Sequence, residues 1–292
     1  MTILITGASG FVGSKVLDEL LNNYNKDEII ALSSRNLKIR TIVHKDYEFN
    51  LQNGDEIDTL IHIGAFIPKS SNEVNDYDKN TSNIINTKKL LDLNLKHLKK
   101  IIFISTVDVY NQADVTNENT QTSPVSLYGW SKLYCEKMIE SYSKERGIDC
   151  QILRLGHVFG EGEEKYQKIL PLTIKKVLNN ENIEIWGDGK AIRTFIYIDD
   201  VAKAIVNSIK LEGHNIINIV GEEQIEIGDL VQKIIKISGK NIKIDYIHPE
   251  TKNRNLVFDN TKLKQLLLPS LTNLDNGLEK EYHYMESLLE VV

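Results

Sequence analysis

The chain has 292 residues, of which 41% are hydrophobic and 26% charged, and its formal net charge is −6. This length suits one large domain, or a core domain with a smaller lobe. Acidic and basic residues are interspersed without a basic stripe, which argues against a nucleic-acid partner.

The cysteines, histidines and N-terminal residues predict a cytoplasmic protein without a metal. Cys135 and Cys150 form no CxxC pair, and the 7 histidines form no HExxH pattern or His/Cys cluster. The two thiols are therefore expected to be reduced, as is typical of the cytoplasm. The first residues, MTILITGASG, do not resemble a signal peptide, and no apolar run approaches the roughly 20 residues of a membrane helix.

Short apolar segments alternate with helical patterns in the first half of the chain. Strands are predicted at 2–6, 29–32, 41–44, 58–63, 101–105 and 150–155, and helices at 11–23, 77–97 and 128–146. The predicted inner faces are Val12, Val16, Leu17, Leu20 and Leu21 in the first helix, and Leu133, Met138, Ile139 and Tyr142 in the third. Because a parallel crossover needs a helix to return the chain, this alternation predicts a parallel sheet. Continuous apolar strands require helices on both faces, so we expect an α/β, doubly wound sheet over residues 1–160.

The pattern loosens after Gly160, where a polar, hinge-like segment covers residues 160–164. Helices are predicted near 167–179, 199–209 and 227–237, from residue 260, and near 275–288, with short strands between them. We expect residues 161–292 to form a smaller α/β lobe that binds substrate at the C-terminal edge of the sheet. Some C-terminal segments are expected to return to the core.

A glycine-rich turn lies between the first strand and the first helix. Its GxxGxxG spacing permits a tight turn and lets a pyrophosphate approach the backbone, while the helix N-terminus supplies amide donors. The strand before it and the helix after it provide the context that this motif requires, so we predict dinucleotide binding. The residues expected to bind are Gly7, Ser9, Gly10, Phe11, Val12 and Gly13.

The end of the second strand bears on the choice of dinucleotide. An acid usually stands there and holds the ribose hydroxyls, but this chain has Ser33, Ser34 and Arg35. A guanidinium binds phosphate in a forked geometry, so Ser34 and Arg35 favour NADP over NAD. The alternative is that Arg35 is solvated and that the site accepts either cofactor.

Tyr128 and Lys132 stand four residues apart on one face of the third helix. A free phenol has a pKa of about 10, and a neighbouring ammonium and a nicotinamide cation both favour the tyrosinate. Tyr128 is therefore a candidate acid/base. The spacing alone is weak, because a chain with this many Tyr and Lys residues contains it by chance, and an ordinary surface turn is the alternative. Its position after the 101–105 strand and the glycine-rich turn supports the functional interpretation.

Together these motifs resemble the extended short-chain dehydrogenase/reductase family, in its nucleotide-sugar epimerase/dehydratase group. The matching segments are TGASGFVG, Asn50-Leu51, His62–Ala65, Asn83–Leu91, Phe103–Tyr110, Tyr128–Lys132, Arg154–Gly160, Trp186–Ala202 and Asp259–Lys262. The resemblance covers nearly the whole chain and implies a Rossmann fold, a nucleotide-sugar substrate, and a homodimer through the helices near 80–97 and 128–146.

The resemblance implies a role for each matching residue. Tyr128 would be the acid/base, Lys132 would activate it and anchor the cofactor ribose, and Thr106 would bind the reacting sugar oxygen. Further cofactor contacts would come from Asn50, Leu51, Ile63, Gly64 and Ala65. Substrate contacts would come from Phe66, Thr106, Asp108, His157 and Arg193, with Lys252 or Arg254 as a second phosphate-binding cation.

Three of these assignments have structural alternatives. Arg193 could form a salt bridge with Asp188 or Asp199 instead of binding phosphate. His157 could be a packed histidine, and Asp108 could cap its loop rather than touch the sugar.

The resemblance also has departures that bear on the reaction. The family's dehydratases have Thr-Asp-Glu where this chain has Thr106-Val107-Asp108, and valine cannot transfer a proton. With the NADP-like site, this favours an NADPH-dependent reductase of a nucleotide-linked 4-keto-6-deoxy-sugar. The main alternative is an NAD-dependent nucleotide-sugar 4-epimerase, followed by a dehydratase or decarboxylase. A dinucleotide-sensing protein without activity also stays open, because fold does not fix function.

Overall fold

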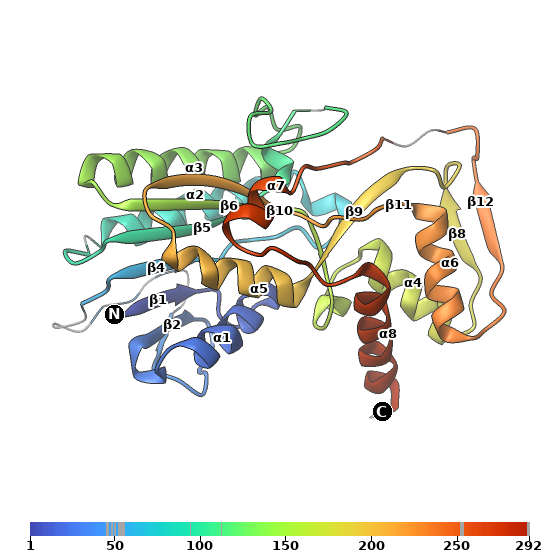
Figure 1. The fold of residues 1–292 in the computed structure, drawn as a ribbon, viewed down its shortest axis with the longest axis horizontal. Helices are drawn as coiled ribbons and strands as arrows, with labels where there is room; N and C mark the ends of the chain where they lie inside the picture. The colour runs from blue at the N-terminus through green and yellow to red at the C-terminus, as the bar shows by residue number, and fades with distance from the viewer. Residues whose placement is uncertain are drawn as a thin grey trace.

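The computed structural model describes residues 1–44, 47, 49, 51, 56–93, 95–111, 113–251 and 254–290. A parallel sheet with helices on both faces forms the larger part, and a smaller lobe with short sheets adjoins it (Figure 1).

The large sheet contains seven described strands in the order β10-β6-β5-β4-β1-β2-β3, and every neighbouring pair is parallel. Its strands are β1 (Ile3–Thr6), β2 (Ile29–Ser33), β3 (Thr41–Val43), β4 (Thr59–His62), β5 (Lys100–Thr106), β6 (Asp149–Leu155) and β10 (His214–Ile219). The strand order reverses between β1 and β4, which is the Rossmann arrangement and places a crevice at their carboxyl ends. The predicted α/β fold class is confirmed, and six of these strands were predicted from the sequence.

Helices cover both faces of this sheet, as its continuous apolar strands require. Helices α1 (Phe11–Asn23) and α5 (Ile198–Asn207) pack together on one face, and α2 (Tyr77–Asp92) and α3 (Leu127–Arg146) pack together on the other (Figure 1). Successive side chains of β1 point to opposite faces of the sheet. Ile3 and Ile5 belong to the apolar core that includes α1 and α5, and Leu4 belongs to the core that includes α2 and α3.

Two predicted helix faces need correction. Leu21 is 37% exposed, because it falls at the edge of the α1 stripe that faces the sheet. Met138 is only partly covered and lies outside the core, because α3 turns Cys135 toward the sheet in its place. The predicted Ile139 is buried, and Tyr142 packs against the same core.

The second half of the chain contributes to both parts of the molecule. Strand β10 extends the large sheet beside β6, and α5 packs on α1. The remaining strands are β7 (His157–Phe159), β9 (Ile192–Tyr197) and β11 (Gln224–Glu226) in one sheet, and β8 (Ile183–Trp186) and β12 (Ile244–Ile247) in another. The remaining α-helices are α4 (Ile169–Leu178), α6 (Ile227–Ser238), α7 (Thr261–Leu266) and α8 (Leu274–Glu290), and the 3₁₀ helices are η1 (Lys26–Glu28), η2 (Ser71–Glu73), η3 (Val107–Val109), η4 (Glu163–Lys165) and η5 (Ser208–Lys210).

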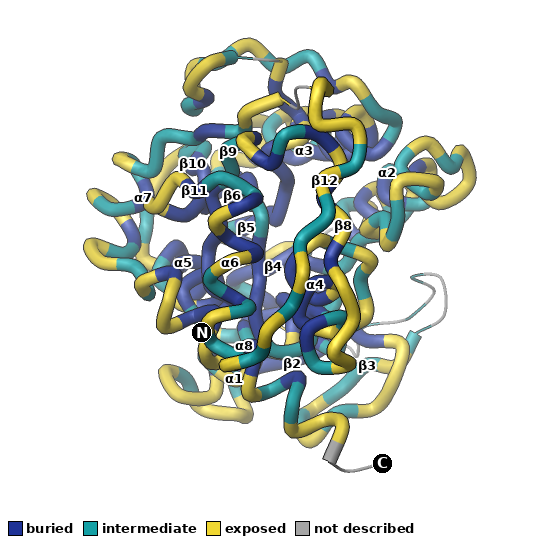
Figure 2. The backbone as a smooth tube through the Cα atoms, turned by 90° about the vertical axis from the view of Figure 1, so that its right-hand side faces the viewer, coloured by how far each residue is buried: buried dark blue, intermediate teal, exposed yellow. Residues whose placement is uncertain are grey.

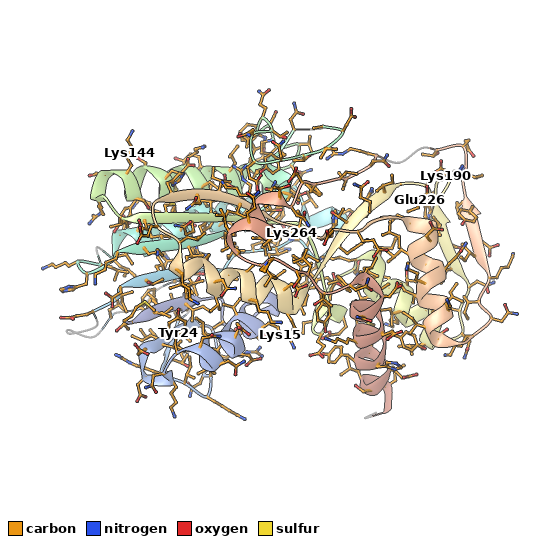
Figure 3. The ribbon with its side chains drawn as sticks, in the orientation of Figure 1. Lys15, Tyr24, Lys144, Lys190, Glu226 and Lys264 are labelled. Carbon is orange, nitrogen blue, oxygen red and sulfur yellow. The ribbon has the colours of Figure 1, made fainter. Side chains whose placement is uncertain are left out.

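The connection after β7 is tied to the N-terminal part of the chain. Gly160 and Gly162 have positive φ angles of 129° and 98°. Lys15 of α1, seen beside α5 in Figure 3, lies with its Nζ 2.6 Å from Glu161 Oε2 and 4.0 Å from Asp199 Oδ1. These contacts link the connection to α1.

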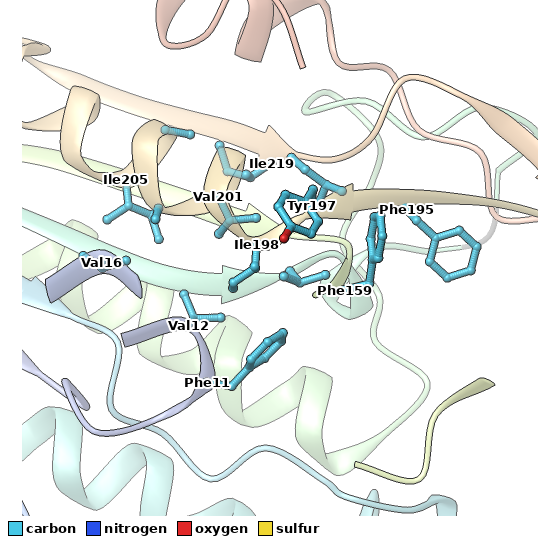
Figure 4. Close-up of a cluster of buried hydrophobic side chains, with 14 of the residues drawn as sticks. Phe11, Val12, Val16, Phe159, Phe195, Tyr197, Ile198, Val201, Ile205 and Ile219 are labelled. Carbon is cyan, nitrogen blue, oxygen red and sulfur yellow. The ribbon is translucent and has the colours of Figure 1, made fainter. Parts of the chain in front are cut away.

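A buried apolar cluster also joins the two parts (Figure 4). Phe11 and Val12 are the first residues of α1 and lie near α5. The centres of the Phe159 and Tyr197 rings are 5.5 Å apart. The strands of the large sheet are mostly buried along their length, whereas β8 and β12 mix buried and exposed positions (Figure 2). The residues at the carboxyl ends of β1 and β4, where the crevice lies, are therefore supported by a closely packed core.

Candidate active site

The glycine-rich turn depends on close backbone contacts. Gly7 has a φ of +70°, and a Cβ atom there would lie 2.6 Å from the Gly64 amide nitrogen. A Cβ on Gly13 would lie 2.0 Å from the Gly7 carbonyl oxygen. The helix that follows begins at the N-cap Gly10 without a side-chain capping bond, so its first amides are available to an anion.

A buried hydrogen-bond network fixes this turn against β4. Thr6 Oγ1 lies 2.8 Å from His62 Nδ1 and accepts a hydrogen bond from the Gly64 amide at 2.9 Å. His62 Nε2 lies 3.0 Å from Thr87 Oγ1 on α2. Burial, with the Lys132 charge, lowers the His62 pKa to about 3, so this histidine is neutral at pH 7. The segment Ile63, Gly64 and Ala65 is thereby held beside Gly7.

The end of β2 lies against the glycine-rich turn. The Arg35 guanidinium donates a hydrogen bond to the Ser9 carbonyl at 2.7 Å, and Ser33 Oγ donates to Ser9 Oγ at 3.1 Å. Ser34 is exposed next to them. Of the expected cofactor contacts Asn50 and Leu51, Leu51 is partly buried and Asn50 lies outside the described residues.

The first turn of α1 also contributes to the apolar core. The Phe11 and Val12 side chains are 9% and 7% exposed and belong to the core between α1 and α5 (Figure 4). Any contact that these two residues make with a dinucleotide therefore falls to their backbone amides.

The three candidate catalytic side chains come together at the carboxyl end of β5. Thr106 is the last residue of β5, and Tyr128 and Lys132 lie on the first turns of α3, which packs on that strand. The three are 8%, 9% and 3% exposed. Ser126 Oγ accepts a hydrogen bond from the Gly129 amide at 3.1 Å, and this cap fixes where α3 begins.

The electrostatics of Tyr128 differ from the expectation. Burial raises the Tyr128 pKa, Asp108 raises it further, and a hydrogen bond with Thr106 opposes both. The Lys132 ammonium lies 4.2 Å from the centre of the Phe103 ring, and burial lowers the Lys132 pKa to about 8. The net shift of the Tyr128 pKa in the protein alone is therefore opposite to the expected direction, because burial and Asp108 raise it and Lys132 is not among the groups that shift it.

Asp108 follows Thr106 at the start of η3. Its backbone amide donates a hydrogen bond to Thr106 Oγ1 at 3.2 Å, so the loop is capped by Thr106 and not by the Asp108 carboxylate. Asp108 is exposed to solvent, but protein atoms surround its carboxylate on several sides. The resulting desolvation raises the pKa of Asp108. Thr106, Arg254 and Lys168 oppose this shift, which places both cations within electrostatic reach of the carboxylate.

A buried ion pair behind this site was not predicted from the sequence. Arg154 Nη2 lies 2.6 Å from Glu136 Oε2, Arg154 Nε donates to Glu136 Oε1 at 3.0 Å, and their side chains are 3% and 0% exposed. Ser105 also donates to Glu136, and the Arg154 guanidinium lies 4.6 Å from the centre of the Tyr110 ring. Two features of the sequence could have indicated this pair. Glu136 lies four residues after Lys132, and Arg154 begins the Arg154–Gly160 segment that resembles the family.

Two of the five expected substrate contacts, His157 and Arg193, line a pocket of about 510 Å³ in the smaller lobe, and Thr106 and Asp108 are not part of its lining. Its polar lining includes His157, Glu163, Lys168 and Arg193, and its apolar lining includes Ile183, Ile185, Ala191, Phe195, Ile227 and Val231. Phe66 lies outside this lining, on the segment after β4, where its amide donates to Asn83 Oδ1 at 2.7 Å.

Arg193 makes no bond to the expected acids. Its Nη1 donates to the carbonyls of Ile192 at 2.8 Å and Arg254 at 2.6 Å, so the alternative of a salt bridge to Asp188 or Asp199 is wrong. Burial and the Arg254 charge lower the Arg193 pKa. Such a guanidinium, half buried beside a second cation, is stabilised by a bound anion. Lys252, the other candidate cation, lies outside the described residues.

His157 is packed against the core and also faces the pocket. Its ring packs 5.7 Å from the Phe195 ring and also lines the pocket. Burial, followed by the charges of Arg193 and Lys168, lowers its pKa to about 4, so it is neutral at pH 7. Its buried Nδ1 has no hydrogen-bond partner among the described residues.

The described residues contain no group of three or more His, Cys, Asp or Glu side chains that could hold a metal ion. No helix in this part of the chain is both long and apolar enough to cross a membrane.

Comparison with known proteins places this geometry in a family. A model of the NAD-dependent epimerase/dehydratase family matches residues 3–220. The sequence is 32% identical to an uncharacterized UDP-glucose epimerase, YtcB, of Bacillus subtilis (strain 168), over 99% of both chains.

Two solved structures share the fold over 99% of this chain and 100% of their own. The UDP-glucuronic acid 4-epimerase of Bacillus cereus, in complex with UDP-glucuronic acid and NAD, is 29% identical with a TM-score of 0.82. The UDP-glucose 4-epimerase of Thermotoga maritima, with UDP-glucose, is 25% identical with a TM-score of 0.84.

Proposed function

The chain belongs to the NAD-dependent epimerase/dehydratase family, and from that premise we propose that it is a 4-epimerase of a nucleoside-diphosphate sugar that uses NAD. The observation that carries the proposal is the grouping of Thr106, Tyr128 and Lys132 at the carboxyl end of β5, beside the glycine-rich turn. The similar proteins named above are UDP-sugar epimerases, two of them 4-epimerases, which supports this reaction over the reductase expected from the sequence.

The chemistry assigns separate tasks to the three side chains. NAD supplies a reversible hydride acceptor. Tyr128 takes the proton from the C4 hydroxyl and returns it after the transient 4-keto sugar has turned its other face. Thr106 orients the reacting oxygen, and the Lys132 cation favours the tyrosinate once a positive nicotinamide shares the site. The raised pKa of Tyr128 keeps it protonated before the cofactor binds.

The 510 Å³ pocket suits the nucleotide part of the substrate. Its apolar side, which includes Ile185 and Val231, can hold a planar base. Its polar side presents Arg193 and Lys168, with Arg254 nearby, to a diphosphate.

Val107 separates this reaction from dehydration. It stands where the family's dehydratases have an acid, its side chain is 8% exposed, and it packs with Val109 and Leu133. A 4-epimerase needs no second proton-transfer group at that position.

The choice of cofactor rests on the end of β2. The Bacillus cereus enzyme was solved with NAD, which supports NAD here, whereas Arg35 without an acid favours NADP. A fluorescence titration with NADH and NADPH separates the two. NADPH binding more than about tenfold tighter, which corresponds to about 1.4 kcal/mol, would contradict NAD as the cofactor and revive the reductase.

The reaction itself can be tested without knowing the sugar. A panel of UDP-, dTDP- and GDP-sugars is incubated with the protein and its own bound cofactor, and products are separated by chromatography. The proposal expects C4 epimers to appear without added cofactor. Consumption of added NADPH with a 4-keto-sugar, and no epimer, would support the reductase instead, and tight dinucleotide binding with no turnover would support a sensor.

Quaternary structure and location stay part of the proposal. Trp130 and Tyr134 on α3 are 51% and 57% exposed, and Ile85 on α2 is 49% exposed. Such an apolar surface on two neighbouring helices supports the expected homodimer, which light scattering after gel filtration tests directly. The cytoplasmic location remains a prediction.

A further inference from the structure

Helix α8 carries a carboxyl group in the middle of its buried face. Leu274, Leu278, Glu281 and Met285 follow one another at spacings of four, three and four residues, which places them on one stripe of the helix. All four are buried, and Glu281 is only 1% exposed. A glutamate therefore occupies a position where this stripe otherwise has apolar side chains.

A second buried carboxyl group meets Glu281 from the other side. Glu163, in η4 after the Gly160–Gly162 connection, is 2% exposed, and its carboxyl group lies within interaction distance of that of Glu281. Glu163 Oε2 and both Glu281 oxygens are buried and have no hydrogen bond of good geometry among the described residues. Two neighbouring carboxyl groups, with three oxygens lacking such a bond, can satisfy each other only if a proton lies between them.

One cation accompanies this pair. Lys168 Nζ lies 3.1 Å from Glu163 Oε1. With both carboxyl groups ionised the cluster of Glu163, Glu281 and Lys168 would carry a net charge of −1 in a buried site, and with one shared proton it is neutral. Burial of charge favours the neutral arrangement.

The surroundings favour the shared proton. Burial is the largest cause that raises the pKa of each carboxyl group, and Glu163 raises the Glu281 pKa well above its usual value. The groups that face the pair are Lys168, Glu164, Tyr166, Tyr197 and the Gly160 amide. Lys168 and the Gly160 amide oppose the shift, while Glu164 adds to it.

Glu163 and Lys168 also line the 510 Å³ pocket. We propose that Glu281 is a protonated carboxylic acid that donates to Glu163, keeps this cluster neutral, and so positions Lys168 for an anionic nucleoside diphosphate. Glu281 acts through its neighbours and does not touch the ligand. The inference rests on the proposed function, because the ligand class comes from there.

Loss of that proton has a defined consequence. As the pH rises through the pKa of the pair, the cluster gains a negative charge beside the pocket, and an anionic diphosphate is repelled. We expect the affinity for UDP to fall by about fivefold as the pair loses its shared proton, beyond the change seen in a variant without the titrating proton.

The test compares wild type with Glu281→Gln and with Glu279→Gln. Glutamine keeps a hydrogen-bond donor toward Glu163 but has no titratable proton. Glu279 is exposed on the same helix, so its variant is the matched control. Calorimetric titration with UDP should show the alkaline loss of affinity in wild type and Glu279→Gln, and a flat profile in Glu281→Gln. Overlapping profiles for all three proteins would overturn the positioning role.

A measurement without ligand separates this inference from the proposed function. Because the Glu281 pKa is raised in the folded state, the stability that its proton supports is present at low pH and is lost as the pH rises through that pKa. The melting temperature of wild type should therefore fall relative to Glu281→Gln as the pH rises above the ordinary glutamate value of 4.5 and until the folded-state pKa is passed, with Glu279→Gln following wild type. A constant difference would overturn the shared proton. Absence of UDP binding in every protein would overturn the proposed function and with it the effect on the pocket.

Discussion

The buried Arg154–Glu136 pair gives the sharpest stability prediction. Replacing Arg154 with Met leaves the Glu136 carboxylate at 0% exposure, with the Ser105 hydroxyl as its remaining donor among the contacts described above. Breaking a buried pair by removing one partner costs about 3–5 kcal/mol, because an uncompensated charge stays in the core. Unfolding of 292 residues at about 2.1 cal/mol/K per residue converts this to a melting-temperature loss of about 5–8 °C.

A double-mutant cycle identifies the cause. Urea unfolding is measured for Arg154→Met, Glu136→Met and the double variant, whose two apolar side chains leave no buried charge. The double variant should be less destabilised than the sum of the two single variants by at least about 2 kcal/mol. Lys88→Met, which breaks an exposed pair with Asp92 on α2, is the control and should cost less than about 0.5 kcal/mol. Additive losses in the double variant would refute the argument.

Three further predictions concern the proposed active site. Gly7→Ala should lose NAD binding in a fluorescence titration and cost about 1–3 kcal/mol of stability from its left-handed backbone alone, since its Cβ would also overlap Gly64; unchanged binding would contradict the geometry of the turn. Because burial lowers the Lys132 pKa to about 8, its ammonium is lost above that pH, and the pH profile of kcat/KM should decline on its alkaline side near 8; a flat profile up to pH of about 9.5 would show that this charge is not needed. Arg193→Met should weaken UDP binding by about 10- to 100-fold in calorimetry, whereas Lys190→Met, on the exposed part of the same lobe in Figure 3, should leave it unchanged; equal effects would remove Arg193 from the anion site.

The sequence by itself determined the sheet, the glycine-rich turn and the Tyr128–Lys132 arrangement. Each depends on local properties: the length of an apolar run, glycines at positions where a Cβ would clash, and two side chains one helical turn apart. The fold class followed, because alternating strands and helices leave few ways to bury both faces. The position of β10 beside β6 was foreseen only in general terms, since sequence order does not fix which strand a distant segment joins.

Only the tertiary structure decided the electrostatics. Lys132 was expected to lower the pKa of Tyr128, but burial and Asp108 raise it. The desolvation of a side chain depends on segments that are distant in the sequence, so the sequence does not reveal it. The contacts of Glu163 with Glu281, and of Glu136 with Arg154, join residues 118 and 18 positions apart, and nothing in the pattern of either segment announces its partner. A charged residue within an apolar stripe, such as Glu281, predicts that a partner exists. Which residue that partner is, and whether a proton lies between them, depends on how the chain is packed.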